Sequence, residues 1–133
     1  MAIRLKPIKD QVIVITGASS GIGLATALEA GKRGARVVLA SRDEQDIKKA
    51  AEQITEAGGQ AIPVVADVGD QLAMESLAEQ AIVAFDRIDT WVNNAGVSIA
   101  AGWISVTEIG AFSSCSSMRM ESVNAFTACL LAA

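Results

Sequence analysis

The chain has 133 residues, of which 51% are hydrophobic and 20% are charged, and its formal net charge at pH 7 is -4. This length and composition predict one globular domain with a buried core and argue against a disordered chain. The negative charge and the absence of a basic cluster exclude nucleic acid as an expected partner. No apolar run approaches the roughly 20 residues that a membrane-spanning helix needs, so no membrane partner is expected.

Missing residue types narrow the chemistry further. The chain has no histidine, which excludes zinc sites and catalytic triads built on that residue, and we predict no metal site. Cys115 and Cys129 are too few for a disulfide scaffold. Residues 1–10 contain no secretory apolar segment. A cytoplasmic location is therefore expected.

A glycine-rich run joins the first predicted strand to the first predicted helix. The β-branched residues 12–15 are typical of a buried parallel strand, and residues 24–33 predict a helix. Between them stands TGASSGIG, residues 16–23. Such a turn holds phosphate, because free N–H groups and the positive end of the helix dipole point there and glycine permits a close approach. The candidate cofactor-binding residues in this run are Gly17, Ser19, Ser20, Gly21, Ile22 and Gly23.

The spacing of the glycines distinguishes the kinds of phosphate site. A P-loop needs Lys-Ser or Lys-Thr directly after its last glycine, whereas Leu24 and Ala25 follow here. The usual dinucleotide fingerprint is G-x-G-x-x-G, but this chain has the variant G-x-x-x-G-x-G. An ordinary strand-to-helix turn is the alternative to a phosphate site.

Strand and helix patterns continue to alternate along the chain. Residues 36–40 predict a second strand, and a helix follows over about residues 43–57. Ser41 and Asp43 are alternative N-caps for this helix, and Gly58-Gly59 ends it. Its apolar face is expected to comprise Ile47, Ala50, Ala51 and Ile54.

Residues 61–66 predict a third strand, which Pro63 places at an edge of the sheet. Asp70 is the expected N-cap of a third helix that ends near Phe85, and residues 88–92 predict a fourth strand. The inward face of the third helix is expected to comprise Leu72, Leu77, Ala81 and Ile82. This alternation predicts an α/β fold in which helices cover both faces of a parallel sheet. Ligands of such sheets bind beyond the carboxyl ends of the strands.

Residues at these strand ends indicate the cofactor. After the second strand come Ser41 and Arg42, and neither supplies a carboxylate for the ribose hydroxyls of NAD. The planar guanidinium of Arg42 suits the 2′-phosphate of NADP, so NADP is favoured over NAD. A solvated arginine at a helix start is the alternative interpretation. After the fourth strand, NNAG combines side chains that bond free backbone groups with small residues that leave room for a cofactor.

Together, TGASSGIG and NNAG resemble the motifs of the short-chain dehydrogenase/reductase family over roughly residues 10–100. The resemblance implies a Rossmann-like sheet of about four strands in the order 3-2-1-4. It also implies that Asp67 and Val68, after the third strand, contact the adenine, although Asp67 is a turn residue in the alternative interpretation. Further cofactor contacts are implied for Asn94, Ala95 and Gly96.

Members of this family transfer a hydride between a nicotinamide and a carbonyl or alcohol carbon. The resemblance implies a Y-x-x-x-K pair, in which tyrosine is the general acid/base and lysine lowers the pKa of its phenol, together with a serine and an asparagine. This chain has no tyrosine, and its lysines all precede Ala50. Asn124 resembles the family's asparagine and is the one catalytic candidate, with a chance match as the alternative.

The last part of the chain differs in composition, since residues 104–133 hold three charged residues, both cysteines and the cluster SSCSS. We expect a Rossmann-type dinucleotide-binding region over 1–103 and a poorly specified segment over 104–133, with a short helix from about Met118. Because family members are longer, the chain is expected to be the NADP-binding half of an oxidoreductase, truncated relative to the family and inactive alone. The alternative is a non-catalytic nucleotide-binding or self-associating module.

The order 3-2-1-4 leaves the fourth strand at an edge of the sheet. Ile88, Trp91 and Val92 make this edge apolar, and such an edge invites pairing with another chain. Apolar surface is also expected to be exposed where the family has further helices. A homo-oligomer or aggregation is therefore expected.

Overall fold

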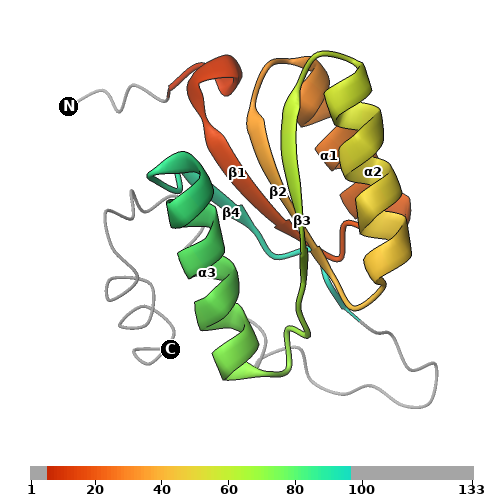
Figure 1. The fold of residues 1–133 in the computed structure, drawn as a ribbon, viewed down its shortest axis with the longest axis vertical. Helices are drawn as coiled ribbons and strands as arrows, with labels where there is room; N and C mark the ends of the chain where they lie inside the picture. The colour runs from red at the N-terminus through yellow and green to blue at the C-terminus, as the bar shows by residue number, and fades with distance from the viewer. Residues whose placement is uncertain (1–5, 97–133) are drawn as a thin grey trace, which may run out of the picture.

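A parallel sheet of four strands organises residues 6–96, the part of the chain that the computed structural model describes (Figure 1). The spatial order of the strands is β3-β2-β1-β4, so the α/β class and the strand order expected from the sequence are confirmed. The strands are β1 (Val12–Thr16), β2 (Arg36–Ser41), β3 (Gln60–Val65) and β4 (Thr90–Val92). The helices are α1 (Gly21–Lys32), α2 (Glu44–Glu56), α3 (Gln71–Phe85) and the short 3-10 helix η1 (Ile8–Asp10).

The central strand β1 fixes the register of its neighbours. It pairs with β2 from Val12↔Arg36 to Thr16↔Ala40, and with β4 from Ile13↔Thr90 to Ile15↔Val92. All five residues of β1 are buried, as the unbroken β-branched run predicts for a strand covered on both faces. Pro63 lies in the edge strand β3, which confirms the position predicted for it.

The helices form a layer on each face of the sheet (Figure 1). Because successive side chains of a strand point to opposite faces, Ile13 and Ile15 face α1 and α2 whereas Val14 faces α3. The apolar face predicted for α2 is buried at all four of its positions, Ile47, Ala50, Ala51 and Ile54. Of the two alternative N-caps of α2, Ser41 and Asp43, the structure has Asp43, which accepts a hydrogen bond from the N–H of Asp46. The cap predicted at Asp70 is confirmed, since Asp70 accepts a hydrogen bond from the N–H of Leu72.

The inward face predicted for α3 was wrong at Leu72, which is 73% exposed. A residue five positions from Leu77 lies about 140° away around a helix, so it falls outside the buried stripe. Ile82 is only partly buried. The side chains of α3 that are buried are Met74, Leu77, Ala78 and Ala81, a spacing of three and four residues.

Two predicted boundaries also moved. Helix α1 begins at Gly21 rather than Leu24, so the end of the glycine run is itself helical. Strand β4 begins at Thr90 rather than Ile88, because the chain bends at Asp89 and leaves Ile88 as an isolated bridge residue. Within residues 6–96, no helix combines the length and the apolar character needed to cross a membrane. The predicted segment 104–133 lies outside the described residues.

Candidate cofactor site

An open cleft of about 550 Å³ lies beyond the carboxyl ends of the strands. The segments that follow β1, β2, β3 and β4 all contribute to its wall, as expected for a ligand site of an open parallel sheet. The predicted site residues that line it are Gly17, Ser19, Ser20, Ser41, Arg42, Asp67, Val68, Asn94, Ala95 and Gly96.

Some predicted residues lie elsewhere, and some wall residues had not been predicted. Gly21, Ile22 and Gly23 form the first turn of α1 and are not part of the wall, and the side chain of Ile22 is 79% exposed. Asn124 lies outside the described residues. Ala66 and Gly69 line the cleft although sequence reasoning missed them; their place directly beside the Asp67-Val68 pair was the available signal.

The glycine turn packs backbone against backbone on the NNAG loop. Gly17 has a φ of +66°, and a Cβ added there would lie 2.8 Å from the Cα of Ala95. A Cβ added to Gly23 would collide with the carbonyl oxygen of Gly17 and lie 2.5 Å from Nδ2 of Asn94. Glycine is therefore required at both positions by the close approach of two chain segments that are far apart in the sequence.

Backbone amides at the start of α1 remain available to a ligand. Ser20 is the N-cap of α1, and its side chain makes no capping hydrogen bond. The first N–H groups of a helix have no partner within the helix, and the dipole of the helix is positive at this end. This arrangement, beside a turn of glycines and small residues, fits the pyrophosphate of a dinucleotide.

The buried hydroxyl of Thr16 joins the two loops that form the centre of the wall. It donates to the carbonyl oxygen of Val92 at 3.3 Å and accepts from the N–H groups of Asn94 and Ala95 at 3.1 and 3.2 Å. The side-chain amide of Asn94 donates to the carbonyl oxygen of Gly17 at 3.2 Å. Sequence reasoning had placed Thr16 in the motif without giving it this role.

The other asparagine of the NNAG loop, Asn93, is held by Trp91, whose indole N–H donates to its side-chain oxygen at 2.9 Å. Trp91 is 7% exposed and belongs to the core under α3. The first asparagine of the loop is therefore tied to the core, whereas the second is tied to the glycine turn.

Arg42 is the exposed cation of the wall. Among residues 6–96, no carboxylate lies within ion-pair distance of its guanidinium. The neighbouring carboxylate of Asp43 is engaged as the N-cap of α2, and Ser41 accepts a hydrogen bond from the N–H of Asp43 at 3.2 Å. The donors of Arg42 are thus free to meet an anion in the cleft.

Asp67 follows β3, shapes a turn and also lines the cleft. One of its oxygens accepts a hydrogen bond from the N–H of Gly69 at 2.9 Å, which shapes the turn into α3. The residue also lines the cleft beside Val68, whose side chain is 47% exposed. An acceptor and an apolar surface are thus placed side by side, as a base needs for a hydrogen bond and a packing contact.

Comparison with known proteins agrees with this geometry. The family model described as short chain dehydrogenase matches residues 11–133. The chain belongs to the short-chain dehydrogenase family. The resemblance proposed from TGASSGIG and NNAG is therefore confirmed.

Two curated relatives illustrate the extent of the match. The chain is 52% identical over 105 residues to the uncharacterized oxidoreductase YxnA of Bacillus subtilis (strain 168), and the match covers 79% of this chain and 30% of that protein. It is 36% identical over 101 residues to the (2S)-[(R)-hydroxy(phenyl)methyl]succinyl-CoA dehydrogenase subunit BbsD of Thauera aromatica, covering 76% of this chain and 41% of that protein. The chain spans less than half of the length of these relatives.

Solved structures of the family give the same fold with different cofactors. A metagenomic short-chain oxidoreductase in complex with NADP is 42% identical, with a TM-score of 0.65 over 69% of this chain and 42% of that one. A short chain dehydrogenase/reductase from Burkholderia phymatum in complex with NAD is 35% identical, with a TM-score of 0.67 over 70% of this chain and 33% of that one. Short-chain dehydrogenases similar to this chain therefore hold either dinucleotide.

Proposed function

We propose that residues 1–103 form the NADP-binding half of a short-chain dehydrogenase/reductase-like oxidoreductase. The observation that carries this proposal is the cleft at the carboxyl ends of the strands, whose wall combines the glycine turn with Arg42 and Asp67. The bound cofactor would supply a hydride to, or take one from, a carbonyl or alcohol carbon. Residues 104–133 form a separate segment in this proposal.

Each part of the wall has a proposed share of the cofactor. The glycine turn would hold the pyrophosphate with backbone N–H groups, together with the first turn of α1 (Gly21, Ile22 and Gly23), which adjoins the wall without lining it. Asp67 would accept a hydrogen bond from the adenine amino group, and Val68 would pack on the ring. Asn94, Ala95 and Gly96 would lie on the other side of the turn, where small residues leave room for the rest of the dinucleotide.

The proposed preference for NADP rests on Arg42. Its guanidinium has no carboxylate partner among residues 6–96, so no ion pair within these residues has to break when it binds a phosphate. A planar guanidinium binds phosphate oxygens with two parallel hydrogen bonds, and Ser41 adds a hydroxyl beside it. NAD has no phosphate at this position and gains nothing from these donors.

Calorimetric titration of the full chain with NADP and with NAD tests the proposal. We expect tighter binding of NADP, and we expect Arg42→Ala to weaken NADP binding by about tenfold or more, since a hydrogen bond to a charged group contributes about 1.5–3 kcal/mol. Binding of NAD should not change. Arg33→Ala is the matched control, because Arg33 is an exposed arginine at the far end of α1 that pairs with Glu29.

Equal affinity for the two dinucleotides in the wild-type chain would remove the role given to Arg42. If Arg42→Ala and Arg33→Ala weaken NADP binding equally, Arg42 acts only through the net charge of the chain. If neither dinucleotide binds at millimolar concentration, the cofactor-binding proposal itself fails.

The hydride-transfer step is proposed separately from binding. The 133 residues include no tyrosine, and Asn124 is the one proposed catalytic residue. We therefore expect no oxidation of NADPH by the purified chain with assorted carbonyl compounds, and measurable turnover would contradict this. The cytoplasmic location expected from the sequence stays a prediction that cell fractionation tests.

A further inference from the structure

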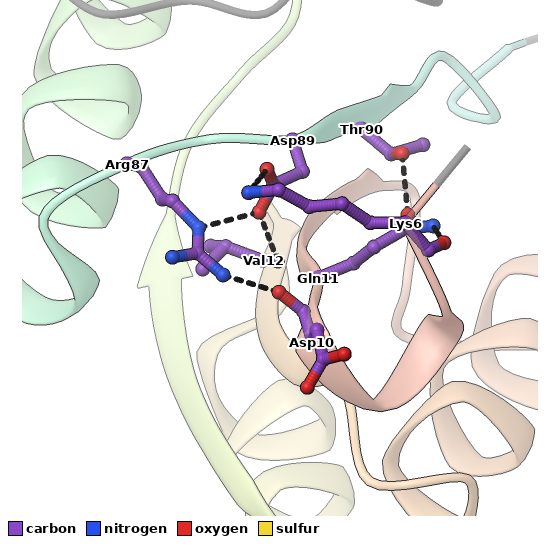
Figure 2. Close-up of polar contacts among 7 residues, drawn as sticks. All are labelled: Lys6, Asp10, Gln11, Val12, Arg87, Asp89 and Thr90. Atoms are coloured by element: carbon purple, nitrogen blue, oxygen red, sulfur yellow. Dashed lines mark hydrogen bonds and ion pairs between the residues drawn. The ribbon is translucent and has the colours of Figure 1, made fainter. Parts of the chain in front are cut away.

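A second polar cluster lies at the opposite end of the sheet from the cleft, where β1 and β4 begin (Figure 2). Its centre is the carboxylate of Asp89, whose side chain is 8% exposed. One oxygen accepts from Nζ of Lys6 at 2.7 Å. The other accepts from the backbone N–H of Val12 at 2.9 Å and from Nε of Arg87 at 2.8 Å.

Further hydrogen bonds connect the residues that surround this carboxylate (Figure 2). Arg87 also donates to the carbonyl oxygen of Asp10. Gln11 donates to the carbonyl oxygen of Lys6 at 2.7 Å and accepts from the hydroxyl of Thr90 at 2.8 Å. The Asp89 network is defined here as Lys6, Asp10, Gln11, Val12, Arg87, Asp89 and Thr90. It joins the segment before β1 to the start of β4.

Strand β4 depends on its two ends because it is short. It has three residues and, among the strands described, it pairs only with β1, through three residue pairs. The Asp89 network holds its first end, and the hydroxyl of Thr16 holds the carbonyl oxygen of Val92 at the last. Asp89 directly precedes β4 and Asn94 follows its last residue by two positions, so we expect a displacement at one end of this short strand to reach the other.

The Asn94-Ala95 loop, which follows β4, tolerates little displacement. Ala95 packs on Gly17 so closely that a Cβ on Gly17 would lie 2.8 Å from the Cα of Ala95. The amide of Asn94 must also stay within reach of the carbonyl oxygen of Gly17. A shift of β4 along β1 by a fraction of an ångström therefore changes the wall of the cleft.

We propose that Asp89 is a positioning residue for the cofactor cleft, which holds β4 in place along β1 and thereby sets the Asn94-Ala95 loop against the Gly17 turn. This inference rests on the proposed function, because its main consequence is a change in dinucleotide affinity. Asp89 itself does not line the cleft.

The test compares Asp89→Asn with two controls in the full chain. Asp46→Asn makes the same chemical change on α2, where Asp46 pairs with Lys49 at the surface. Ile47→Val removes one buried methylene from the core on the α2 face of the sheet and so lowers stability at a residue outside β4 and outside the Asp89 network. Each variant is titrated with NADP at a temperature at which circular dichroism shows it fully folded.

A spectroscopic readout is recorded on the same proteins. Trp91 lies in β4 between the two ends, and its indole N–H bonds Asn93. With Trp103→Phe as the background, the indole N–H resonance in a nitrogen-15 spectrum belongs to Trp91. If Asp89 stabilises only the contacts within the Asp89 network, the Asp89→Asn change leaves the Trp91 resonance where it is in the wild-type chain.

We expect Asp89→Asn to raise the dissociation constant for NADP at least about fivefold and to move the Trp91 resonance, while both controls leave the two readouts unchanged. Unchanged affinity and resonance in Asp89→Asn would overturn the inference, as would an equal loss of affinity in Ile47→Val. If the wild-type chain binds no dinucleotide, the proposed function fails. The Trp91 resonance then decides alone whether Asp89 positions β4: a shift confined to Asp89→Asn supports the inference, and no shift overturns it.

Discussion

The hydroxyl of Thr16 accepts a hydrogen bond from the backbone N–H of Asn94 at 3.1 Å, across 78 residues of sequence. The same hydroxyl donates to the carbonyl oxygen of Val92 and accepts from the N–H of Ala95. Thr16 is 1% exposed, so these backbone groups have little access to water as a substitute. A single side chain at the end of β1 therefore orders the loop that follows β4.

Replacing Thr16 with valine tests this role, because valine keeps the shape and removes the hydroxyl. We expect Thr16→Val to lower the free energy of unfolding by about 1–3 kcal/mol, the cost of leaving buried polar groups unsatisfied, and to weaken dinucleotide binding. Urea denaturation and calorimetric titration measure the two effects. Thr16→Ser keeps the hydroxyl and should retain most of the affinity; a serine variant as weak as the valine variant would contradict the hydrogen-bonding role.

Gly17→Ala is expected to be more damaging than the same change at Gly58. Both glycines have positive φ, +66° and +87°, so both changes bring a backbone cost of about 1 kcal/mol. A methyl group at Gly17 also meets Ala95, whereas nothing lies within 4 Å at Gly58. Overpacking should add about 1–3 kcal/mol to the loss of stability at Gly17 alone. Equal urea midpoints for the two variants would show that the loop yields to the added methyl.

Much of the fold follows from patterns within single elements. The β-branched run of β1 and the spacing of Ile47, Ala50, Ala51 and Ile54 each encode a buried face in a few neighbouring residues. The caps at Asp43 and Asp70 are equally local, since each bonds an N–H two or three residues ahead. Such features can be predicted because their physical cause lies within one turn or one strand.

The features that sequence reasoning missed depend on contacts between distant segments. Leu72 has an apolar side chain in the first turn of α3, but the position of the helix on the sheet leaves it exposed. Thr16 bonds partners 76–79 residues away, and Asp89 bonds Lys6 and Val12, which lie 83 and 77 residues away. Nothing in the neighbouring sequence separates Asp89 from an ordinary loop aspartate. Most residues that line the cleft could be predicted from the sequence, whereas the residues that hold those segments in place could not.

Self-association is predicted from the edge strand β4. Among the strands described, β4 pairs with β1 alone, and a strand at the edge of a sheet invites pairing with another chain. The apolar residues Ile88 and Trp91 are buried, with exposures of 2% and 7%, so these two side chains add little apolar surface to the edge. We expect light scattering of the purified chain to detect dimers or larger species. Val83→Lys, which removes an 85% exposed apolar side chain of α3, should not abolish them. A monodisperse monomer over the accessible concentration range would contradict the prediction.

The Asp89 network should make stability fall in strong acid. Burial raises the pKa of Asp89, but hydrogen bonds from Lys6, Arg87 and the N–H of Val12, together with the charge of Arg87, outweigh it and lower the pKa from 3.8 to about 2. Because the pKa is lower in the folded than in the unfolded chain, the carboxylate stabilises the fold above the unfolded value. That contribution, about 2 kcal/mol, is lost as the pH falls from about 4 through 2.

Urea denaturation of the wild-type chain and of Asp89→Asn at pH 7, 5, 3 and 2 measures this contribution. The free energies of unfolding should differ most at pH 7 and 5 and converge toward pH 2, since protonated aspartate and asparagine are both neutral and leave Lys6 and Arg87 without an anion. Asp46→Asn should give a much smaller difference, because the ion pair of Asp46 with Lys49 is exposed to solvent. A gap between wild type and Asp89→Asn that stays constant down to pH 2 would mean that packing of the side chain, rather than its charge, holds the start of β4.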